Sequence, residues 1–413
     1  MRIALVAHHG SPLTQGNGPE SIFPAAGIAA HAQTLARLGH RVTIYARRDS
    51  RGLPGSAILA PRVTVEHVAA GPLTPLTGDE LAAHVAGFGD YLAQRWRRNP
   101  PSLAHAYFWT SGLAALAAVR GWDIPLVQTF GTLGAAERRH GPAGHQHDGR
   151  IRMEACIARS ARAVLASTAA EAAELARMGV PRTSVTVVPG GVDTDEFTPE
   201  GPVAKRNGHP RLLAVAPWVG VAGSELALAE REGLGVLVRM LARVPGAELV
   251  IAGGPARAQL TKDPAHRDLV QLAERFGVAG RLTFTGKVAQ AGLPALLRSA
   301  DLLVSAAPYD PAGSVAVAAM ACGTPVAACS ADGLTDAVID GTTGVLVPAS
   351  RPDLLARRVR LLLASPLRLE AFGIAAADRA RARYSWDRIS RETVAAYERC
   401  LRPAPAELAQ ATS

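Results

Sequence analysis

The chain has 413 residues, of which 48% are hydrophobic and 19% are charged. This composition excludes an extended disordered protein, and the length predicts two or more domains with large cores. The formal net charge is +9, but the arginines are scattered along helical stretches such as 379–383 without interleaved aromatic residues, so we expect a solvated basic surface rather than a nucleic-acid interface.

Short apolar runs alternate with helical patterns along the first half of the chain. This alternation predicts a parallel sheet with crossover helices. Strands are predicted at residues 2–7, 41–45, 63–67, 103–106, 126–130, 163–166 and 186–188. Helices are predicted at residues 25–38 and 79–96, and Gly39 ends the first of them.

A polar stretch that contains Pro and Gly, residues 198–210, interrupts this pattern and is the predicted linker. A second series of strands is predicted at residues 211–216, 248–252, 281–284, 302–305, 325–328 and 344–347. Residues 386–401 read as a long amphipathic helix, followed by a frayed tail. We therefore predict an α/β protein with two doubly wound, Rossmann-like domains at residues 1–200 and 201–385. The C-terminal segment, residues 386–413, is expected to pack its helix back on the first domain.

Residues 309–320 have the form of a strand end, a glycine turn and a helix. Ligands of doubly wound folds bind outside the carboxyl ends of the strands, and the free N–H groups of a helix start attract anions. Gly313, Ser314 and Val315 are the candidate donors of these N–H groups. Asp310, which precedes Pro311, has two interpretations of equal weight that do not exclude each other: a contact with the ligand, and an N-cap followed by proline at the first helical position.

Several local patterns in order along the chain resemble one enzyme family. They are the segments at residues 188–197, 251–255, 284–288, 321–326 and 341–347. In this order and spacing they resemble the retaining family 4 glycosyltransferases, and most closely the bacterial glycosyltransferases of the mycothiol pathway. The resemblance spans nearly the whole chain, from about Met1 to Tyr397. It implies the GT-B fold, in which two such domains face a central cleft, and a nucleotide-sugar donor as substrate.

The resemblance also implies an arginine and a lysine that hold the donor diphosphate, which gains negative charge as the sugar leaves. Here Pro217 stands at the arginine position and Glu232 at the lysine position, with residues 220–230 as extra sequence between them. Loss of one such group commonly costs about a hundredfold to a thousandfold in rate. Arg231 or Lys287 could supply a substitute cation.

Two family glutamates flank the same helix start, one on the transferred sugar and one on the ribose. The first is replaced by Asp310, which is the candidate catalytic residue, and the second by Ala318, which cannot form a side-chain hydrogen bond. The other donor-site candidates, all at predicted strand or helix ends, are Gly253, Gly254, Gly286, Lys287, Val288, Gly313, Ser314 and Val315.

The first domain departs from the family as well. The segment at residues 22–25, Ile22-Phe23-Pro24-Ala25, stands where the family has paired glycines, and Gly131 stands where the family has a histidine that contacts the sugar. The acceptor-side candidates are His8, His9, His105, Tyr107, Gly131 and Thr132. A lone His105 is more typical of a packed strand-end residue than of a catalyst.

No metal and no cofactor other than the nucleotide-sugar donor is expected. The cluster of His140, His145, His147 and Asp148 in and beside a glycine-rich loop indicates an acceptor-site loop or an exposed loop rather than a metal site. The cysteines lack zinc-type spacing and are expected to be buried, reduced thiols of a cytosolic protein; they are Cys156, Cys322, Cys329 and Cys400. The apolar run at residues 1–9 is too short for a signal peptide, and no membrane span is predicted.

Three functions remain open at this stage. The retained cleft scaffold favours an active glycosyltransferase with an altered donor site. Losses at four separate positions favour instead a non-catalytic partner of a homologous protein; these are Gly131, Pro217, Glu232 and Ala318. A different group transfer on the same scaffold is suggested only by Trp218, Tyr107 and Tyr309. We favour the active glycosyltransferase slightly over the other two hypotheses, because another residue nearby can replace a lost functional group, and the site then only looks inactive in the sequence.

Overall fold

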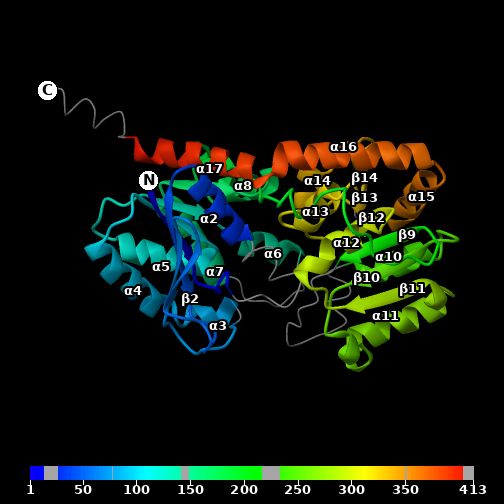
Figure 1. The fold of residues 1–413 in the computed structure, drawn as a ribbon, viewed down its shortest axis with the longest axis horizontal. Coiled ribbons are helices and arrows are strands. Elements are labelled where there is room, and N and C mark those ends of the chain that lie inside the picture. Colours follow the sequence, from blue (N-terminus) through cyan, green and yellow to red (C-terminus); the bar gives the residue numbers. More distant parts are fainter. Residues whose placement is uncertain (14–26, 77, 141–147, 216–232, 349–350, 403–413) are drawn as a thin grey trace.

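Figure 1 shows the computed structural model, in which two α/β domains lie side by side and two long helices run along one edge of both. The structure describes residues 1–13, 27–76, 78–140, 148–215, 233–348 and 351–402. The positions at 14–26, 141–147, 216–232 and 403–413 that carried sequence predictions lie outside these ranges. They include Ile22, Phe23, His145, His147, Pro217, Trp218, residues 220–230, Arg231 and Glu232.

The first domain contains an eight-stranded sheet in the order β3-β4-β2-β1-β5-β6-β7-β8. Its strands are β1 (Arg2–Ala7), β2 (Arg41–Arg47), β3 (Ser56–Ala60), β4 (Val63–Val68), β5 (Leu103–Tyr107), β6 (Leu126–Thr129), β7 (Ala163–Ala166) and β8 (Val185–Val187). Its helices are α2 (Gly27–Arg37), α3 (Gly78–Ala82), α4 (Val85–Arg98), α5 (Trp109–Val119), α6 (Gly134–His140), α7 (Asp148–Ser160), α8 (Ala169–Arg177) and the 3-10 helix η2 (Arg182–Ser184).

Two predictions for this domain were wrong in detail. The strand β3 was not expected, and it pairs antiparallel with β4 at the edge of an otherwise parallel sheet. It carries no buried apolar run, since Ile58 is 83% exposed, so the pattern that reveals the buried strands is missing. The single helix predicted at 79–96 is broken into α3 and α4, with His84 at the break. The His84 ring packs against Gly71, where a Cβ atom would lie 2.7 Å from it.

The second domain contains a six-stranded parallel sheet in the order β11-β10-β9-β12-β13-β14. Its strands are β9 (Arg211–Val215), β10 (Glu248–Ala252), β11 (Leu282–Gly286), β12 (Leu302–Ser305), β13 (Val326–Cys329) and β14 (Gly344–Val347). Its helices are α10 (Leu234–Leu241), α11 (Pro264–Arg275), α12 (Leu293–Arg298), α13 (Ser314–Ala321), α14 (Asp332–Ala337), α15 (Pro352–Leu363) and α16 (Pro366–Tyr384). Short 3-10 helices are η3 (Arg257–Lys262), η4 (Ala279–Arg281) and η5 (Gln290–Gly292).

Each sheet is covered by helices on both faces, which confirms the predicted doubly wound fold. In the second domain, Leu212 and Leu249 belong to the core on one face of the sheet, while Leu213 and Val250 belong to the core on the other. Strands buried on both faces must be nearly continuous apolar runs. This requirement explains why the central strands could be predicted from the sequence.

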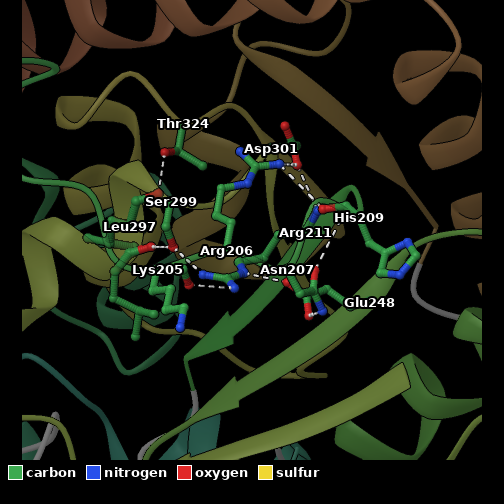
Figure 2. Close-up of polar contacts among 11 residues, drawn as sticks. Lys205, Arg206, Asn207, His209, Arg211, Glu248, Leu297, Ser299, Asp301 and Thr324 are labelled. Atoms are coloured by element: carbon green, nitrogen blue, oxygen red, sulfur yellow. Dashed lines mark hydrogen bonds and ion pairs between the residues drawn. The ribbon is translucent and has the colours of Figure 1, made fainter. Parts of the chain in front are cut away.

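The chain between the two sheets is fixed by a polar network at the amino end of the second sheet (Figure 2). The buried Arg211 donates from Nε to Glu248 (2.7 Å), from Nη1 to the Ser299 hydroxyl (2.9 Å) and from Nη2 to the Lys205 carbonyl (2.9 Å). Asp301 accepts from the Arg211 backbone N–H (2.6 Å) and from Arg206 (2.5 Å). The predicted linker, residues 198–210, contains no helix or strand. Its last part is bound to the second sheet through the Lys205 carbonyl and the Arg206 side chain.

The last helix, α17 (Trp386–Leu401), leaves the second domain and runs along the first, where it packs on α2 and β7 (Figure 1). The end of α16, where the chain returns to the first domain, lies beside the connection between β8 and β9, since the Val192 N–H donates to the Tyr384 carbonyl (2.7 Å). The predicted domain boundary at residue 200 lies between β8 and β9, and the one at residue 385 lies between α16 and α17. The division into domains stays a prediction.

One prediction about the cysteines was wrong: Cys156 is exposed on α7, whereas Cys322, Cys329 and Cys400 are buried. Within the described residues, no helix is both long enough and apolar enough to cross a membrane.

Candidate active site

A cavity of about 510 Å³ lies between the two domains. Its walls come from the carboxyl ends of strands in both sheets, including Tyr107 and Thr129 in the first domain and Val215 and Ser305 in the second. The helix α17 closes a third side with Trp386 and neighbouring residues. Both the position and the volume are typical of a small-molecule site in such folds.

The turn before α13 brings Asp310 to this cavity. The helix starts at Ser314, and Gly313 is its N-cap with φ of 63°, so the prediction of Asp310 as N-cap and Pro311 as first helical residue was wrong. The Oδ1 atom of Asp310 instead accepts from the backbone N–H groups of Gly313 (2.7 Å) and Ala312 (3.3 Å). Burial raises the pKa of Asp310. The turn thus holds one carboxylate oxygen, and the structure gives the second, Oδ2, no hydrogen-bond partner among the described residues.

Ser314 and Val315, in the first turn of α13, also line the cavity. Gly313 itself does not, but it permits the turn: its φ is left-handed, and a Cβ atom there would lie 2.7 Å from the Gly333 carbonyl oxygen. The first N–H groups of a helix have no partner within it. Ala318, on the same helix, is fully buried in the core.

The remaining donor-site candidates lie off this cavity. They lie at the end of β11 or in the loops after β10 and β11, where the Gly253 N–H donates to the Gly286 carbonyl (3.0 Å) and the Lys287 N–H to the Pro255 carbonyl (3.0 Å). These bonds join the two loops at the carboxyl edge of the sheet. Gly253, Gly254, Gly286, Lys287 and Val288 are absent from the described lining of the cavity.

On the acceptor side, His105 and Tyr107 line the cavity from β5. Both ring nitrogens of His105 are used: Nδ1 lies 2.6 Å from the Tyr397 hydroxyl, and Nε2 lies 2.9 Å from the Thr129 hydroxyl. Burial lowers the pKa of His105 well below its usual value. This geometry fits a packed strand-end residue that ties α17 to the first sheet.

Gly131 and Thr132 line the cavity after β6. Gly131 has φ of 73°, and a Cβ atom there would lie 3.0 Å from the Phe108 ring. Thr132 accepts from Arg150 at its carbonyl (3.2 Å) and hydroxyl (2.9 Å) oxygens. Arg150 in turn pairs with Glu137 (2.8 Å) and Glu154 (2.7 Å), so its charge is largely compensated.

His8 and His9 are not brought to the cavity. They follow β1, where the buried His8 ring packs against Phe88 and the half-buried His9 ring packs against Phe108. Their ring nitrogens have no hydrogen-bond partner in the described part of the chain. Burial lowers the pKa of His8 to about 3 and that of His9 to about 4, so both rings are neutral at pH 7.

Two residues of the cavity wall were missed from the sequence, His31 on α2 and Trp386 on α17. Their rings are stacked, with centroids 5.5 Å apart and an interplanar angle of 20°. The His31 Nδ1 atom lies 2.6 Å from the Tyr107 hydroxyl. A signal for His31 does exist, since it interrupts the apolar face that Ile28 and Leu35 continue along α2.

Of the predicted histidine cluster, the structure describes His140 and Asp148, and the two residues have different partners. His140 stacks on Tyr309 of the second domain, with centroids 5.3 Å apart, while Asp148 pairs with Arg138 (2.7 Å). The described residues contain no group of three or more His, Cys, Asp or Glu that could hold a metal ion.

The electrostatics of the cavity are unusual for a site that binds anions. Its charged lining residues, among those the structure describes, are two carboxylates, Glu137 and Asp310, and no Arg or Lys lines it there. The sequence outside the described ranges contains one arginine, Arg231, and no lysine. Backbone N–H groups are therefore the main source of positive potential that the described lining offers.

Comparisons with known proteins agree with this architecture. Residues 26–196 match the family model described as Glycosyltransferase Family 4, and residues 227–379 match Glycosyl transferases group 1. The chain is 33% identical to D-inositol 3-phosphate glycosyltransferase 2 of Catenulispora acidiphila over 97% of this chain and 95% of that protein. It is 32% identical to the D-inositol 3-phosphate glycosyltransferase of Actinosynnema mirum over 96% of each.

Among solved structures, a sucrose-phosphate synthase from Thermosynechococcus elongatus has a TM-score of 0.82 and 25% identity, covering 97% of this chain and 98% of that one. HepE of Anabaena, in complex with UDP and glucose, has a TM-score of 0.68 and 18% identity, covering 95% and 98%. At 18% identity, the likeness to HepE supports the fold alone.

Proposed function

Because this chain belongs to the family 4 glycosyltransferases with the GT-B fold, we propose that it transfers a sugar from a nucleoside-diphosphate sugar to a small-molecule acceptor, with retention, in the cavity between its domains. The cavity joins the carboxyl edges of both sheets, so donor and acceptor can meet there. A cytoplasmic location and a homologous protein partner stay predictions.

The observation that carries this proposal is the arrangement of Asp310 beside the start of α13. One carboxylate oxygen is fixed by two backbone N–H groups at 2.7 and 3.3 Å. The other is left for a hydroxyl of the transferred sugar. Ser314 and Val315 in the first helical turn line the same space, and the first N–H groups of a helix, which have no partner within it, are the donors that a phosphate favours.

The chemistry needs no nucleophile from the protein. As the bond from the anomeric carbon to the diphosphate oxygen breaks, the acceptor oxygen forms its bond on the same face of the sugar, and its proton passes to the departing phosphate. Negative charge grows on the diphosphate in this step. Fixed N–H dipoles at a helix start stabilise such charge without reorganising, and they are what the described lining supplies in place of the missing cations.

The test is release of nucleoside diphosphate from UDP-, GDP-, ADP- and dTDP-sugars in the presence of a panel of hydroxylated acceptors. We expect turnover with one nucleotide, reduced about a hundredfold by Asp310→Asn. The matched control is Asp90→Asn, since Asp90 is an exposed aspartate on α4 outside the cavity. A folded protein that turns over no donor with any acceptor would overturn the proposal, and binding of a nucleotide without turnover would point to the non-catalytic partner.

A further inference from the structure

A second, smaller cavity of about 180 Å³ adjoins the main one and shares Gly131, Thr132, Tyr309 and Pro311 with it. We call it the α6–α8 pocket, because residues of these two helices form much of its wall. Resting on the function proposed above, we propose that the α6–α8 pocket binds a carboxylate group of the acceptor, and that the acceptor is therefore a hydroxylated carboxylic acid.

Two arginines converge on one glutamate in this pocket. Arg139 in α6 and Arg177 at the end of α8 both line the pocket, and both donate to Glu174 Oε2. The Glu174 side chain is only 7% exposed, whereas those of Arg139 and Arg177 are 46% and 57% exposed. One carboxylate between two guanidinium groups leaves a local charge of +1. We refer to these three residues as the arginine pair and its glutamate.

The arginine pair still has N–H groups to offer. Within the described part of the chain, no hydrogen bond uses Nε or Nη1 of Arg139 or Nη1 of Arg177. Because both side chains are partly exposed, a ligand can reach these donors without displacing a packed residue. A guanidinium group binds a carboxylate with two parallel N–H···O bonds, which is the strongest arrangement that such donors can form.

The charges in the pocket favour a single negative charge on the ligand. The local charge of +1 at the arginine pair is matched by one carboxylate. A phosphate dianion would keep one uncompensated charge beside Glu174 and within the same pocket as Glu171 and Asp332. Uncompensated charge in a partly buried site is costly, so we expect a carboxylate to bind more tightly than a phosphate.

The end of the pocket beside the main cavity is acidic. Burial raises the pKa of Tyr309, which lines both cavities, and nearby carboxylates that include Glu171 and Asp332 raise it further. Glu171 lies six residues before Arg177 on α8, which is about 9 Å along the helix axis. Asp332 is half-buried, and its carboxylate has no hydrogen-bond partner among the described residues, so it can accept from a hydroxyl group of the ligand.

This separation of charges orients the acceptor. Its carboxylate lies at the arginine pair, and its hydroxyl groups lie toward Asp332 and the main cavity. A complete small-molecule site usually has at least about 300 Å³, so the α6–α8 pocket fits one part of a ligand whose remainder lies in the main cavity. Pro311 lines both cavities and directly follows Asp310, so a ligand that spans the junction reaches the position proposed for the donor sugar.

The experiment compares three ligands that share one sugar ring and differ at C6: D-glucuronate has a carboxylate there, D-glucose a hydroxymethyl group and D-glucose 6-phosphate a phosphate. Each is titrated into the full chain at pH 7 and followed by ligand-observed NMR. We expect saturable binding of D-glucuronate, at least tenfold tighter than that of the other two.

Arg177→Gln is expected to weaken D-glucuronate binding about tenfold, the effect of one hydrogen bond to a charged group, and to leave D-glucose binding unchanged. Glu174 keeps Arg139 as its partner in this variant, so we expect the protein to fold. The matched control is Arg97→Gln, since Arg97 is an exposed arginine on α4 outside both cavities. It is expected to leave the binding of all three ligands unchanged.

The proposal is overturned if D-glucuronate does not bind, if either of the other ligands binds as tightly, or if Arg177→Gln behaves like Arg97→Gln. The ligand series is measured on the unaltered protein, so the preference for a carboxylate is tested even where a variant fails to fold. A parallel titration with UDP, GDP, ADP and dTDP separates the two proposals. Nucleotide binding without D-glucuronate binding refutes only the acceptor class, whereas D-glucuronate binding that depends on Arg177, without binding of any nucleotide, refutes only the donor site.

Discussion

The ion pair between Arg211 and Glu248 lies at the edge of the second sheet that is away from the cavity. We therefore predict that breaking it lowers the stability of the protein and leaves nucleotide binding unchanged. These residues begin β9 and β10, while the cavity lies beyond the other ends of the strands, at Val215. Their side chains are only 8% and 5% exposed. The substitution Glu248→Gln removes the negative charge and keeps the shape.

The expected cost follows from the burial of the remaining charge. Removing one partner of a buried pair commonly costs about 3–5 kcal/mol, because the other charge is left uncompensated. Gln keeps one acceptor oxygen for Arg211, and Ser299 and the Lys205 carbonyl still accept from it, so we expect about 3 kcal/mol. For a domain of this size, 1 kcal/mol shifts the melting temperature by about 2–4 °C, which predicts a fall of about 6–12 °C.

The assay is a thermal melt together with a nucleotide titration well below the melting temperature. Nucleotide affinity is expected to stay unchanged, and the double variant Arg211→Met/Glu248→Leu is expected to recover most of the stability, since an apolar pair often replaces a buried ion pair. A shift below 2 °C, or a loss of nucleotide affinity in the folded variant, would refute the reasoning.

Three further predictions concern the cavity and the residues beside it. Burial lowers the pKa of His31 to about 4, so the unfolded chain takes up protons below pH 6.5 that the folded chain does not, and stability that is complete above pH 6.5 is lost as the pH falls toward 4; His31 alone contributes about 2 kcal/mol between pH 7 and pH 5. Urea titrations at the two pH values check this, and an equal pH dependence in His31→Leu would contradict it. Gly313→Val places a side chain 2.7 Å from the Gly333 carbonyl at a left-handed φ, so we expect a loss of about 2 kcal/mol or more and of transferase activity, whereas Gly121→Ala, with a positive φ but open space around it, should retain activity in the same assay. Gly191→Ala must displace Trp386, whose ring would lie 2.5 Å from the new Cβ atom; near-ultraviolet circular dichroism should report the changed surroundings of the indole, and an unaltered spectrum would contradict the close packing of Trp386 on Gly191.

The sequence predicted the fold best where one local pattern decides the structure. The strands β1, β7, β10, β12 and β14 have the bounds predicted for them, because each is a short apolar run buried on both faces. The edge strand β3 escaped prediction because Ile58 faces solvent and the pairing with β4 is set by tertiary contact.

The start of α13 shows how a local rule can fail. Asp310 followed by Pro311 is a good helix start by propensity. The observed start is three residues later, because Gly313 takes a left-handed turn whose N–H is bound by Asp310 and whose backbone packs on Gly333. The sequence around Gly313 does not reveal that its backbone packs closely against Gly333, which lies further along the chain.

The lining of the cavity was predicted in part, while the binding and catalytic roles of its residues stay predictions. Asp310, Ser314, Val315, His105, Tyr107, Gly131 and Thr132 all line the cavity, whereas His8, His9 and the residues after β10 and β11 do not. His31 and Trp386 could not be joined from the sequence, because only the return of α17 to the first domain brings them together. Residue type and spacing indicated the scaffold, but the apolar character of the cavity needed the three-dimensional arrangement.

The central claim is that the cavity between the domains binds a nucleoside-diphosphate sugar. The most direct measurement is a thermal-shift titration of the full chain with UDP, GDP, ADP and dTDP, each with and without magnesium. A ligand at about 100 times its Kd stabilises the folded state by about 2.7 kcal/mol, so we predict a clear rise in melting temperature with one nucleotide and a smaller rise in Asp310→Asn when its sugar derivative is used. No shift with any of the four nucleotides would contradict the claim.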